Sequence, residues 1–410
     1  MSDSSTFGVR GHGSALDLED RYCAHNYAPL PVSLVRGHGA WVEDERGTEY
    51  LDLIAAYGAL NFGHCHPRLV EVATKQLATL SLTSRAVHHD QLGPFCRELA
   101  NLCGMQAVIP MNTGAEAIET AIKMARRWAY RMKGVPPERA TVVVCDGNFH
   151  GRTTTIVGFS SDPIARDGFG PFTPGFVQVP FGDADAAARA FDANTAAVLV
   201  EPIQGEAGVI VPPTGYLRAL RELCSDAEVL LIADEVQTGL GRTGATFACD
   251  HEGVRPDAFV LGKALGGGIV PASAVVADRS VLDVFTPGSH GSTFAGNPLA
   301  CAIGRAVIEL LQTGEVQERS KRLGHRLHSG LQDLVGRGAI EVRGRGLWAG
   351  IELDPSVGSG RAVSEALLRR RVLAKETHGQ TLRISPSLLI ADHDLDWALA
   401  QLADTITGLG

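Results

Sequence analysis

The sequence predicts an α/β protein built on a mostly parallel sheet, with a second, smaller α+β domain in its C-terminal third. Two observations support this prediction. In the middle of the chain, short apolar segments rich in β-branched residues alternate with helix-like segments, as in strands joined by crossover helices. From about Asn297 onward, long helical stretches dominate. We therefore expect residues 1–50 to pack with the small domain, residues 51–296 to form the large domain, and residues 297–410 to form the small domain.

The expected strands of the large domain are apolar throughout, as strands covered by helices on both faces should be. They lie at Thr141–Cys145, Phe176–Val179, Ala197–Val200, Val229–Ala233, Ala258–Leu261 and Ala272–Ala277, with helix-like segments such as Tyr216–Cys224 between them. In the C-terminal third, helices are expected at Ala300–Leu311, Val316–Val335, Ser364–Val372 and Asp394–Thr407, and strand structure within Glu341–Glu352.

Composition argues against several classes of protein. A net charge of −9 without any basic tract disfavours nucleic acid as a partner, and no apolar run approaches the length of a membrane span. The eight cysteines are scattered without a CxxC pair, which indicates reduced thiols. The polar segment Met1–Gly13 resembles neither a secretory signal nor a transit peptide. We expect a cytoplasmic protein.

Two strand-like segments end in charged residues that suit catalysis. Asp234 ends the first segment, and Lys263 follows the second after one glycine. Because the carboxyl ends of parallel strands face one crevice, we expect the two side chains to share a site. A lysine that forms a Schiff base with pyridoxal 5'-phosphate (PLP), and a carboxylate that pairs with its pyridinium nitrogen, need this arrangement. The alternative is a surface lysine and an aspartate that starts a turn.

Two further segments offer groups for a planar, phosphorylated cofactor. Thr113 can cap the helix that follows it, and Gly114 would let a phosphate approach the free backbone amides. Phe149 and Arg152 follow the strand Thr141–Cys145, where an aromatic ring can stack on a cofactor and an arginine can hold a carboxylate. The alternatives are an ordinary helix start, a packed phenylalanine and a surface arginine.

Acidic and hydroxyl side chains complete the set of candidates. Glu201 and Glu206 follow another predicted strand, where two carboxylates can orient a substrate amine or compensate an arginine, unless they belong to a solvated turn. Ser292 and Thr293 precede the expected domain boundary and can donate to a phosphate.

Two other motifs compete with this interpretation. The segment Gly239–Gly244 matches GxGxxG, which would suit an NAD-dependent dehydrogenase, but it does not follow its strand directly and no helix pattern comes after it. His64-Cys65-His66 could suggest a metal, but a proline follows and no second ligand pair has zinc-like spacing. We expect a turn and no metal there.

Taken in order, these segments resemble the class III aminotransferases, a family of fold-type I PLP enzymes that act on ornithine, acetylornithine or 4-aminobutyrate. The resemblance runs from about Tyr22 to Thr407, and its motifs are Asn112–Gly114, Phe149–Arg152, Glu201–Glu206, Ala233–Gly239, Gly262–Leu265 and Gly291–Thr293. It implies a seven-stranded, mostly parallel sheet with helices on both faces, PLP as the cofactor, and a homodimer with shared active sites. Whether that dimer assembles further stays open.

The resemblance also implies roles around the cofactor ring. Lys263 would form the Schiff base and then move the proton between the substrate carbon and the cofactor. Asp234 would pair with the pyridinium nitrogen, Gln237 would hydrogen-bond the phenolic oxygen, and Phe149 would stack on the ring.

At the phosphate, the resemblance implies contacts from two subunits. Thr113, Gly114 and Ala115 would hold the phosphate in one subunit, and Ser292 and Thr293 would reach the phosphate of the neighbouring subunit. The site would then require a dimer.

On the substrate side, the resemblance implies a charge switch. Arg152 would hold the α-carboxylate of ornithine far from the ring, with Tyr27 near its α-amine. Arg383 would bind the α-carboxylate of glutamate or 2-oxoglutarate close to the ring, and Glu206 would mask Arg383 in the ornithine half-reaction. Tyr57 occupies a position where the ornithine enzymes carry tyrosine.

The implied reaction is transfer of the terminal amino group of L-ornithine to 2-oxoglutarate, which gives glutamate and glutamate 5-semialdehyde, the precursor of pyrroline-5-carboxylate. His150 departs from the tryptophan of animal ornithine enzymes and is common in acetylornithine enzymes, so N-acetylornithine is the alternative substrate. A glutamate-1-semialdehyde aminomutase is disfavoured. Glu206 and Arg383 would form a switch that admits an external amino acceptor, and an aminomutase needs no such switch.

Overall fold

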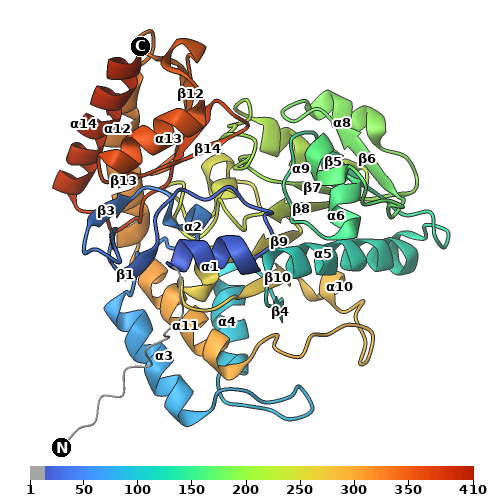
Figure 1. Ribbon diagram of the computed structural model, residues 1–410. Coiled ribbons are helices and arrows are strands. Elements are labelled where there is room, and N and C mark those ends of the chain that lie inside the picture. Colours follow the sequence, from blue (N-terminus) through green and yellow to red (C-terminus); the bar gives the residue numbers. More distant parts are fainter. Residues whose placement is uncertain (1–13) are drawn as a thin grey trace, which may run out of the picture.

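The computed structural model describes residues 14–410 and contains one large sheet and two smaller ones (Figure 1). The prediction for Met1–Gly13 lies outside these residues. The large sheet has seven strands in the order β4-β10-β9-β8-β7-β5-β6. In chain order they are β4 (Ala107–Met111), β5 (Thr141–Cys145), β6 (Phe176–Val179), β7 (Thr195–Val200), β8 (Leu230–Asp234), β9 (Ala258–Leu261) and β10 (Ser273–Ala277).

The predicted mostly parallel sheet is confirmed. Strands β6, β5, β7, β8 and β9 run parallel, whereas β10 is antiparallel to both β9 and β4. Every strand expected in the middle of the chain is present within a residue or two of its expected bounds. The segment β4 was not recognised, because Pro110 cannot donate to a ladder; the strand lies at the edge of the sheet, where a proline is tolerated.

Helices cover both faces of this sheet, because each strand buries alternate side chains on opposite faces. Val142, Val144 and Ile232 pack with α5 (Gly114–Trp128) in one apolar cluster. Val143 and Leu231 belong to the cluster on the opposite face. That face is covered by α4 (Leu92–Cys103), α9 (Tyr216–Asp226) and α11 (Pro298–Gln312), and α11 also packs on α3 (Pro67–Thr79).

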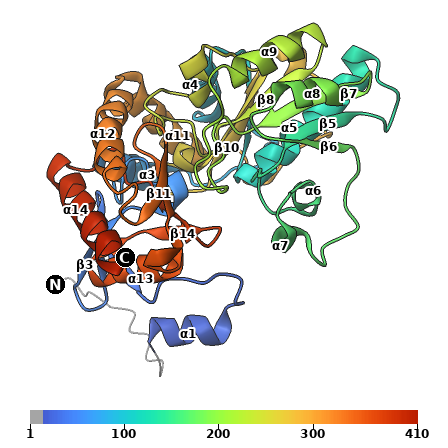
Figure 2. The ribbon, with the colours of Figure 1, turned by 90° about the horizontal axis from the view of Figure 1, so that it is seen from above.

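The C-terminal part of the chain forms a smaller α+β unit. Its four-stranded sheet has the order β11-β12-β15-β14, with β11 (Ala339–Gly344), β12 (Ala349–Leu353), β14 (Lys375–Thr377) and β15 (Thr381–Ile384). The helices α12 (Glu315–Gln332), α13 (Gly360–Arg369) and α14 (Asp392–Leu409) pack with it (Figure 2). The expected helix Ser364–Val372 ends earlier, since Arg371 has φ 66° and Val372 enters a strand.

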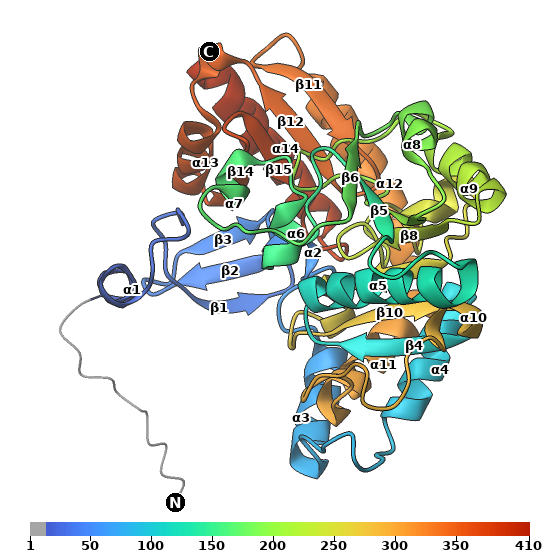
Figure 3. The same ribbon diagram turned by 90° about the vertical axis from the view of Figure 1, so that its right-hand side faces the viewer.

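A third sheet joins the two ends of the chain. Strands β1 (Leu34–His38), β2 (Trp41–Asp44) and β3 (Glu49–Asp52) form an antiparallel set, and β3 pairs in parallel with β13 (Val372–Leu373). Figures 1 and 3 show these blue strands next to the red and orange C-terminal elements. The domain boundaries at residues 50 and 296 stay predictions.

The remaining α-helices are short. They are α1 (Ala15–Tyr22), α2 (Ala55–Gly58), α6 (Thr154–Gly158), α7 (Pro163–Arg166), α8 (Ala184–Ala190) and α10 (Arg279–Leu282). Within residues 14–410, no helix is both long and apolar enough to cross a membrane.

Candidate active site

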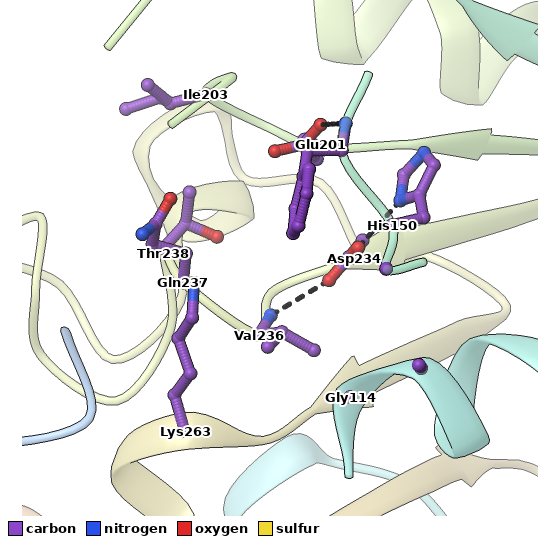
Figure 4. A pocket seen from close by; sticks show the side chains of 12 residues that line it. Gly114, His150, Glu201, Ile203, Asp234, Val236, Gln237, Thr238 and Lys263 are labelled. Carbon is purple, nitrogen blue, oxygen red and sulfur yellow. Dashed lines mark hydrogen bonds and ion pairs between the residues drawn. The ribbon is translucent and has the colours of Figure 1, made fainter. Parts of the chain in front are cut away.

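A cavity of about 190 Å³ lies at the carboxyl ends of the parallel strands (Figure 4). The residues that line it come from the end of β8, from the segments after β5, β7, β8 and β9, and from the start of α5: Gly114, Ala115, Phe149, His150, Gly151, Glu201, Ile203, Asp234, Val236, Gln237, Thr238 and Lys263. The structure therefore brings the two charged strand ends of the sequence together, as expected for an open α/β sheet.

Lys263 begins the short 3-10 helix η3 (Lys263–Gly266) with a backbone φ of 44°, which is rare for a residue with a side chain. Its side chain extends toward Gln237 (Figure 4). Among the described residues 14–410, no group forms a hydrogen bond with its amine. Burial lowers the pKa of Lys263, although the charges of Glu206 and Asp234 oppose the shift. A lysine with a lowered pKa spends part of its time as the neutral amine that a nucleophile or base requires.

Asp234 is buried and is held by two donors. Its Oδ1 accepts from the backbone N–H of Val236 at 3.0 Å, and its Oδ2 accepts from Nδ1 of His150 at 2.7 Å. The imidazole of His150 is completely buried. Burial alone would lower the pKa of His150, but the hydrogen bond and charge of Asp234 outweigh it and raise the pKa. The geometry therefore fixes the Asp234 carboxyl group through the imidazole of His150 on one side and the backbone of Val236 on the other.

Glu201 is also buried at this cavity. Its Oε1 accepts from the backbone N–H of Phe149 at 2.8 Å, so it fixes the segment that carries the aromatic ring. Burial raises the pKa of Glu201 to about 7, although His150 opposes the shift. The contact that the structure shows for Glu201 is to the protein chain, and a contact with substrate stays a prediction.

The start of α5 presents backbone amides to the cavity. Thr113 Oγ1 accepts from the N–H of Glu116 at 3.2 Å, and Glu116 accepts in return from the N–H of Thr113 at 2.9 Å. This capping box leaves the amides of Gly114 and Ala115 free for an anion. A Cβ on Gly114 would lie only 3.1 Å from Val236 Cγ1, so the close approach of α5 to the cavity favours glycine.

Ser292 and Thr293 lie near the same helix start but do not line the cavity. Ser292 Oγ accepts from Asn112 Nδ2 at 2.8 Å and lies 3.4 Å from Glu116 Oε1, within its own chain. Thr293 is exposed. A contact with the phosphate site of a second subunit stays a prediction.

At the other end of the site, Glu206 and Arg383 form an ion pair across the two domains. Glu206 Oε1 lies 2.6 Å from Arg383 Nη1, and the side chains are 26% and 8% exposed. The guanidinium carbon of Arg383 lies 4.8 Å from the centre of the Tyr57 ring. Burial would raise the pKa of Glu206, but Arg383 and Lys263 outweigh it and lower the pKa. Arg383 therefore already has an anionic partner.

Gln237 connects the two ends of the site. Its Nε2 donates to the backbone carbonyl of Tyr57 at 2.9 Å, and Tyr57 itself has a left-handed backbone, with φ 58°. The aromatic ring of Tyr57 is half-buried, and burial raises the pKa of its hydroxyl. The hydroxyl is therefore a neutral hydrogen-bonding group at physiological pH.

Arg152 lies at the mouth of the site. It is exposed, and its guanidinium carbon lies 5.5 Å from the centre of the Phe149 ring. It lines a second, wider cavity of about 470 Å³ together with Glu206 and Thr377. Tyr27 is exposed on the segment before β1 and lines neither cavity.

Sequence reasoning missed three residues that the structure places in the site. Val236 packs between Gly114 and Gly262, and no sequence signal distinguishes it from an ordinary apolar residue. His150 stood out only as a departure from the family pattern, yet it is the partner of Asp234. Thr377 donates to the backbone carbonyl of Glu206 at 2.8 Å, across the domains.

The competing motifs have structural roles. In the GxGxxG segment, the buried Arg242 donates to the carbonyls of Leu347 at 3.0 Å and of Pro386 at 2.7 Å, which ties the segment to the small domain. His64 bonds Asp52 at 2.9 Å. No cluster of histidine, cysteine, aspartate or glutamate that could hold a metal occurs among residues 14–410.

The side chains and amides around the first cavity fit PLP. A lysine amine, a buried carboxylate, a phenylalanine and a valine that line the same cavity, and free amides at a helix start match the aldehyde, ring nitrogen, ring faces and phosphate of that cofactor.

Comparison with known proteins gives the class. The chain belongs to the class III aminotransferases, because residues 22–406 match the family described as "Aminotransferase class-III". It is therefore a PLP-dependent transaminase, and the PLP and fold-type I predictions are confirmed.

Within this family, the chain is 53% identical over 389 residues to an ornithine aminotransferase of Bordetella pertussis, covering 95% of this chain and 94% of that protein. A solved ornithine aminotransferase of Toxoplasma gondii, described with partial occupancy of PLP at its active site, has a TM-score of 0.94 and 43% identity, covering 96% of this chain and 93% of that one. An acetylornithine aminotransferase of Elizabethkingia anophelis has a TM-score of 0.87 and 42% identity, covering 96% of this chain and 98% of that one.

Proposed function

We propose that this transaminase transfers the terminal amino group of L-ornithine to 2-oxoglutarate and so forms glutamate 5-semialdehyde and glutamate. The observation that carries this proposal is the ion pair between Glu206 and Arg383, because it gives an anionic partner to an arginine whose charge acts on Lys263. The name of the Bordetella pertussis relative, at 53% identity, supports the same substrate. N-acetylornithine is the less favoured alternative.

The lining of the first cavity supports the cofactor-binding roles that the family resemblance implies. Lys263 would attach the cofactor through its amine, Asp234 would pair with the ring nitrogen, and Phe149 would stack on the ring. Gln237, whose Nε2 donates to the carbonyl of Tyr57, would hydrogen-bond the phenolic oxygen. When bound, PLP supplies an electron sink for the carbon next to the reacting nitrogen.

At the phosphate, the amides of Gly114 and Ala115 are the donors, and the capping box between Thr113 and Glu116 keeps the helix start rigid. We propose that Ser292 and Thr293 add donors to the phosphate of a second subunit, so that the active enzyme is a homodimer. The scattered, unpaired cysteines support a cytoplasmic location.

Proton transfer falls to Lys263. Its buried amine has a lowered pKa, so it could remove a proton from the substrate carbon that bears the reacting nitrogen. Asp234, held in place by the N–H groups of His150 and Val236, would pair with the ring nitrogen of the cofactor.

Substrate selection depends on charge. Because Glu206 neutralises Arg383, an α-carboxylate placed near Lys263 gains little binding free energy. Ornithine therefore enters with its terminal amine directed toward the lysine. Arg152, exposed at the mouth, then holds the α-carboxylate, and Tyr27 lies near the α-amine. For glutamate and 2-oxoglutarate, Glu206 gives way and Arg383 binds the α-carboxylate bidentately. Glu201 orients this region through the backbone of Phe149.

A paired assay tests the proposed substrate. The PLP-loaded protein is given 2-oxoglutarate with either L-ornithine or N-acetyl-L-ornithine, and glutamate is measured in both reactions. We expect a clear preference for ornithine and formation of pyrroline-5-carboxylate, trapped with o-aminobenzaldehyde. Preference for N-acetylornithine would contradict the proposal and make His150 the better guide to the substrate.

A further inference from the structure

The loop that carries Glu206 is a short hairpin of the large domain. Gln204 and Ile210 exchange two main-chain hydrogen bonds of 3.0 and 2.9 Å at its base, which leaves residues 205–209 as its tip. The side chain of Glu206 reaches Arg383 from this tip. The position of the hairpin therefore decides whether the ion pair can form.

The small domain contacts this tip through Arg343, on β11. Its Nε donates to the backbone carbonyl of Gly208 at 2.7 Å. The rest of the guanidinium is bound within its own sheet, to Glu352 at 2.9 Å, Thr381 Oγ1 at 3.1 Å and Glu341 at 2.9 Å. The side chain is only 14% exposed. These three neighbours hold the guanidinium in the orientation in which its Nε faces the hairpin.

Sheet and hairpin are in direct backbone contact at this point. A Cβ on Gly350 of β12 would lie 2.4 Å from the carbonyl oxygen of Gly208, which is impossible without displacement. Gly208 itself has φ 109°, a conformation that favours glycine. On the other side of the tip, Thr377 Oγ1 donates to the carbonyl of Glu206 at 2.8 Å.

We propose that Arg343 is a positioning residue that holds the Glu206 hairpin against the small domain and thereby determines which amino group of the substrate reacts. The proposal rests on the proposed function, because it concerns the masking of Arg383. With the hairpin backbone anchored at the carbonyls of residues 206 and 208, only the Glu206 side chain is free to move. Without the Arg343 anchor, the tip moves as a unit and Glu206 no longer reaches Arg383 reliably.

A role limited to stabilising the small domain does not account for this geometry. The β11–β12 and β12–β15 ladders already pair the sheet along its length. Among the described residues, the hydrogen bond to Gly208 is the contact by which the Arg343 guanidinium leaves its own sheet.

The test compares Arg343→Lys with Glu341→Gln. Lysine keeps a positive charge beside Glu352 but lacks the planar fork that reaches Gly208 at the same time. Glu341→Gln removes an ion pair on the exposed side of Arg343 and leaves the hairpin contact intact. For each variant, the single-turnover efficiency with ornithine and with glutamate is measured from the visible spectrum of the bound cofactor.

We expect Arg343→Lys to lower the ornithine-to-glutamate efficiency ratio about tenfold, as loss of one well-placed hydrogen bond would, and Glu341→Gln to leave it unchanged. Glutarate, a dicarboxylate without an amine, should also bind more tightly to Arg343→Lys in calorimetry, because Arg383 is less masked. A wild-type ratio and wild-type glutarate affinity in Arg343→Lys would overturn the proposal. If that variant fails to fold, Thr377→Val, which removes the other anchor of the hairpin, must shift the ratio in the same direction.

The variant Glu206→Gln separates the two hypotheses. If Glu206→Gln changes the ratio and Arg343→Lys does not, the Arg343 proposal fails while the proposed function stands. If Glu206→Gln also leaves the ratio unchanged, the masking of Arg383 itself is wrong.

Discussion

Removing the charge of Glu206 is expected to free Arg383 for the α-carboxylate of any substrate. The two side chains are joined by a charge-assisted contact of 2.6 Å, and Arg383 is only 8% exposed. A hydrogen bond between charged groups is worth about 1.5–3 kcal/mol in net terms. Substrates that need Arg383 must displace this contact, so its loss should strengthen their interaction by about 10- to 150-fold.

The variant of choice is Glu206→Gln, which preserves the shape of the side chain and removes its charge. Its efficiency with glutamate should rise relative to ornithine by about the factor above, and ornithine should begin to react at its α-amine. Stopped-flow spectroscopy with each amino acid gives the ratio, and mass spectrometry of the oxo-acid product identifies the amine that reacted. An unchanged ratio together with reaction at the terminal amine alone would show that Glu206 does not mask Arg383.

Three further predictions concern the cofactor end of the site. Lys263→Ala should abolish turnover while PLP still binds noncovalently, seen as loss of the lysine-linked absorbance band with retained PLP after gel filtration; near-normal turnover would exclude Lys263 as the attachment point. His150→Phe should lower the free energy of unfolding of the apo-protein, measured in urea, by about 1.5–3 kcal/mol, because Asp234 loses a buried donor. His150→Asn should recover much of that loss, because the asparagine amide can donate in place of the imidazole. Glu201→Gln should reduce the pH dependence of the apo-protein's Tm. The pKa of Glu201 is raised from 4.5 to about 7 in the fold. Glu201 therefore lowers the stability of the wild-type fold progressively as pH rises between those values, and glutamine has no such effect. A Tm profile that keeps the wild-type slope would contradict the assignment.

The sequence was a good guide wherever the signal is local. The strand β5 at Thr141–Cys145 and the cap at Thr113 depend on residues adjacent in the chain, and both were predicted where they lie. The proximity of Asp234 and Lys263 follows from the general rule that parallel strands end at one edge of the sheet. The edge strand β4 was missed because its proline contradicts the local strand pattern.

Contacts that depend on how the two domains meet could not be predicted from residue patterns. Arg343 and Gly208 are distant in the sequence, and no pattern near either residue predicts the hydrogen bond between them. The pairing of Glu206 with Arg383 was expected only from the family resemblance. The sequence around a glutamate that follows one strand and an arginine within another does not indicate how close the two side chains lie in the fold. His150 shows the same limit, because its partner Asp234 lies on a different strand.

The transfer of the terminal nitrogen of ornithine is tested most directly by following the nitrogen itself. L-ornithine labelled with ¹⁵N at the terminal amine is incubated with the enzyme, PLP and 2-oxoglutarate, and the glutamate formed is analysed by mass spectrometry. If the terminal amine is transferred, the label appears in glutamate from the first turnovers. If the glutamate is unlabelled and the label stays in the oxo acid formed from ornithine, the α-amine has reacted instead, which would contradict transfer of the terminal amine.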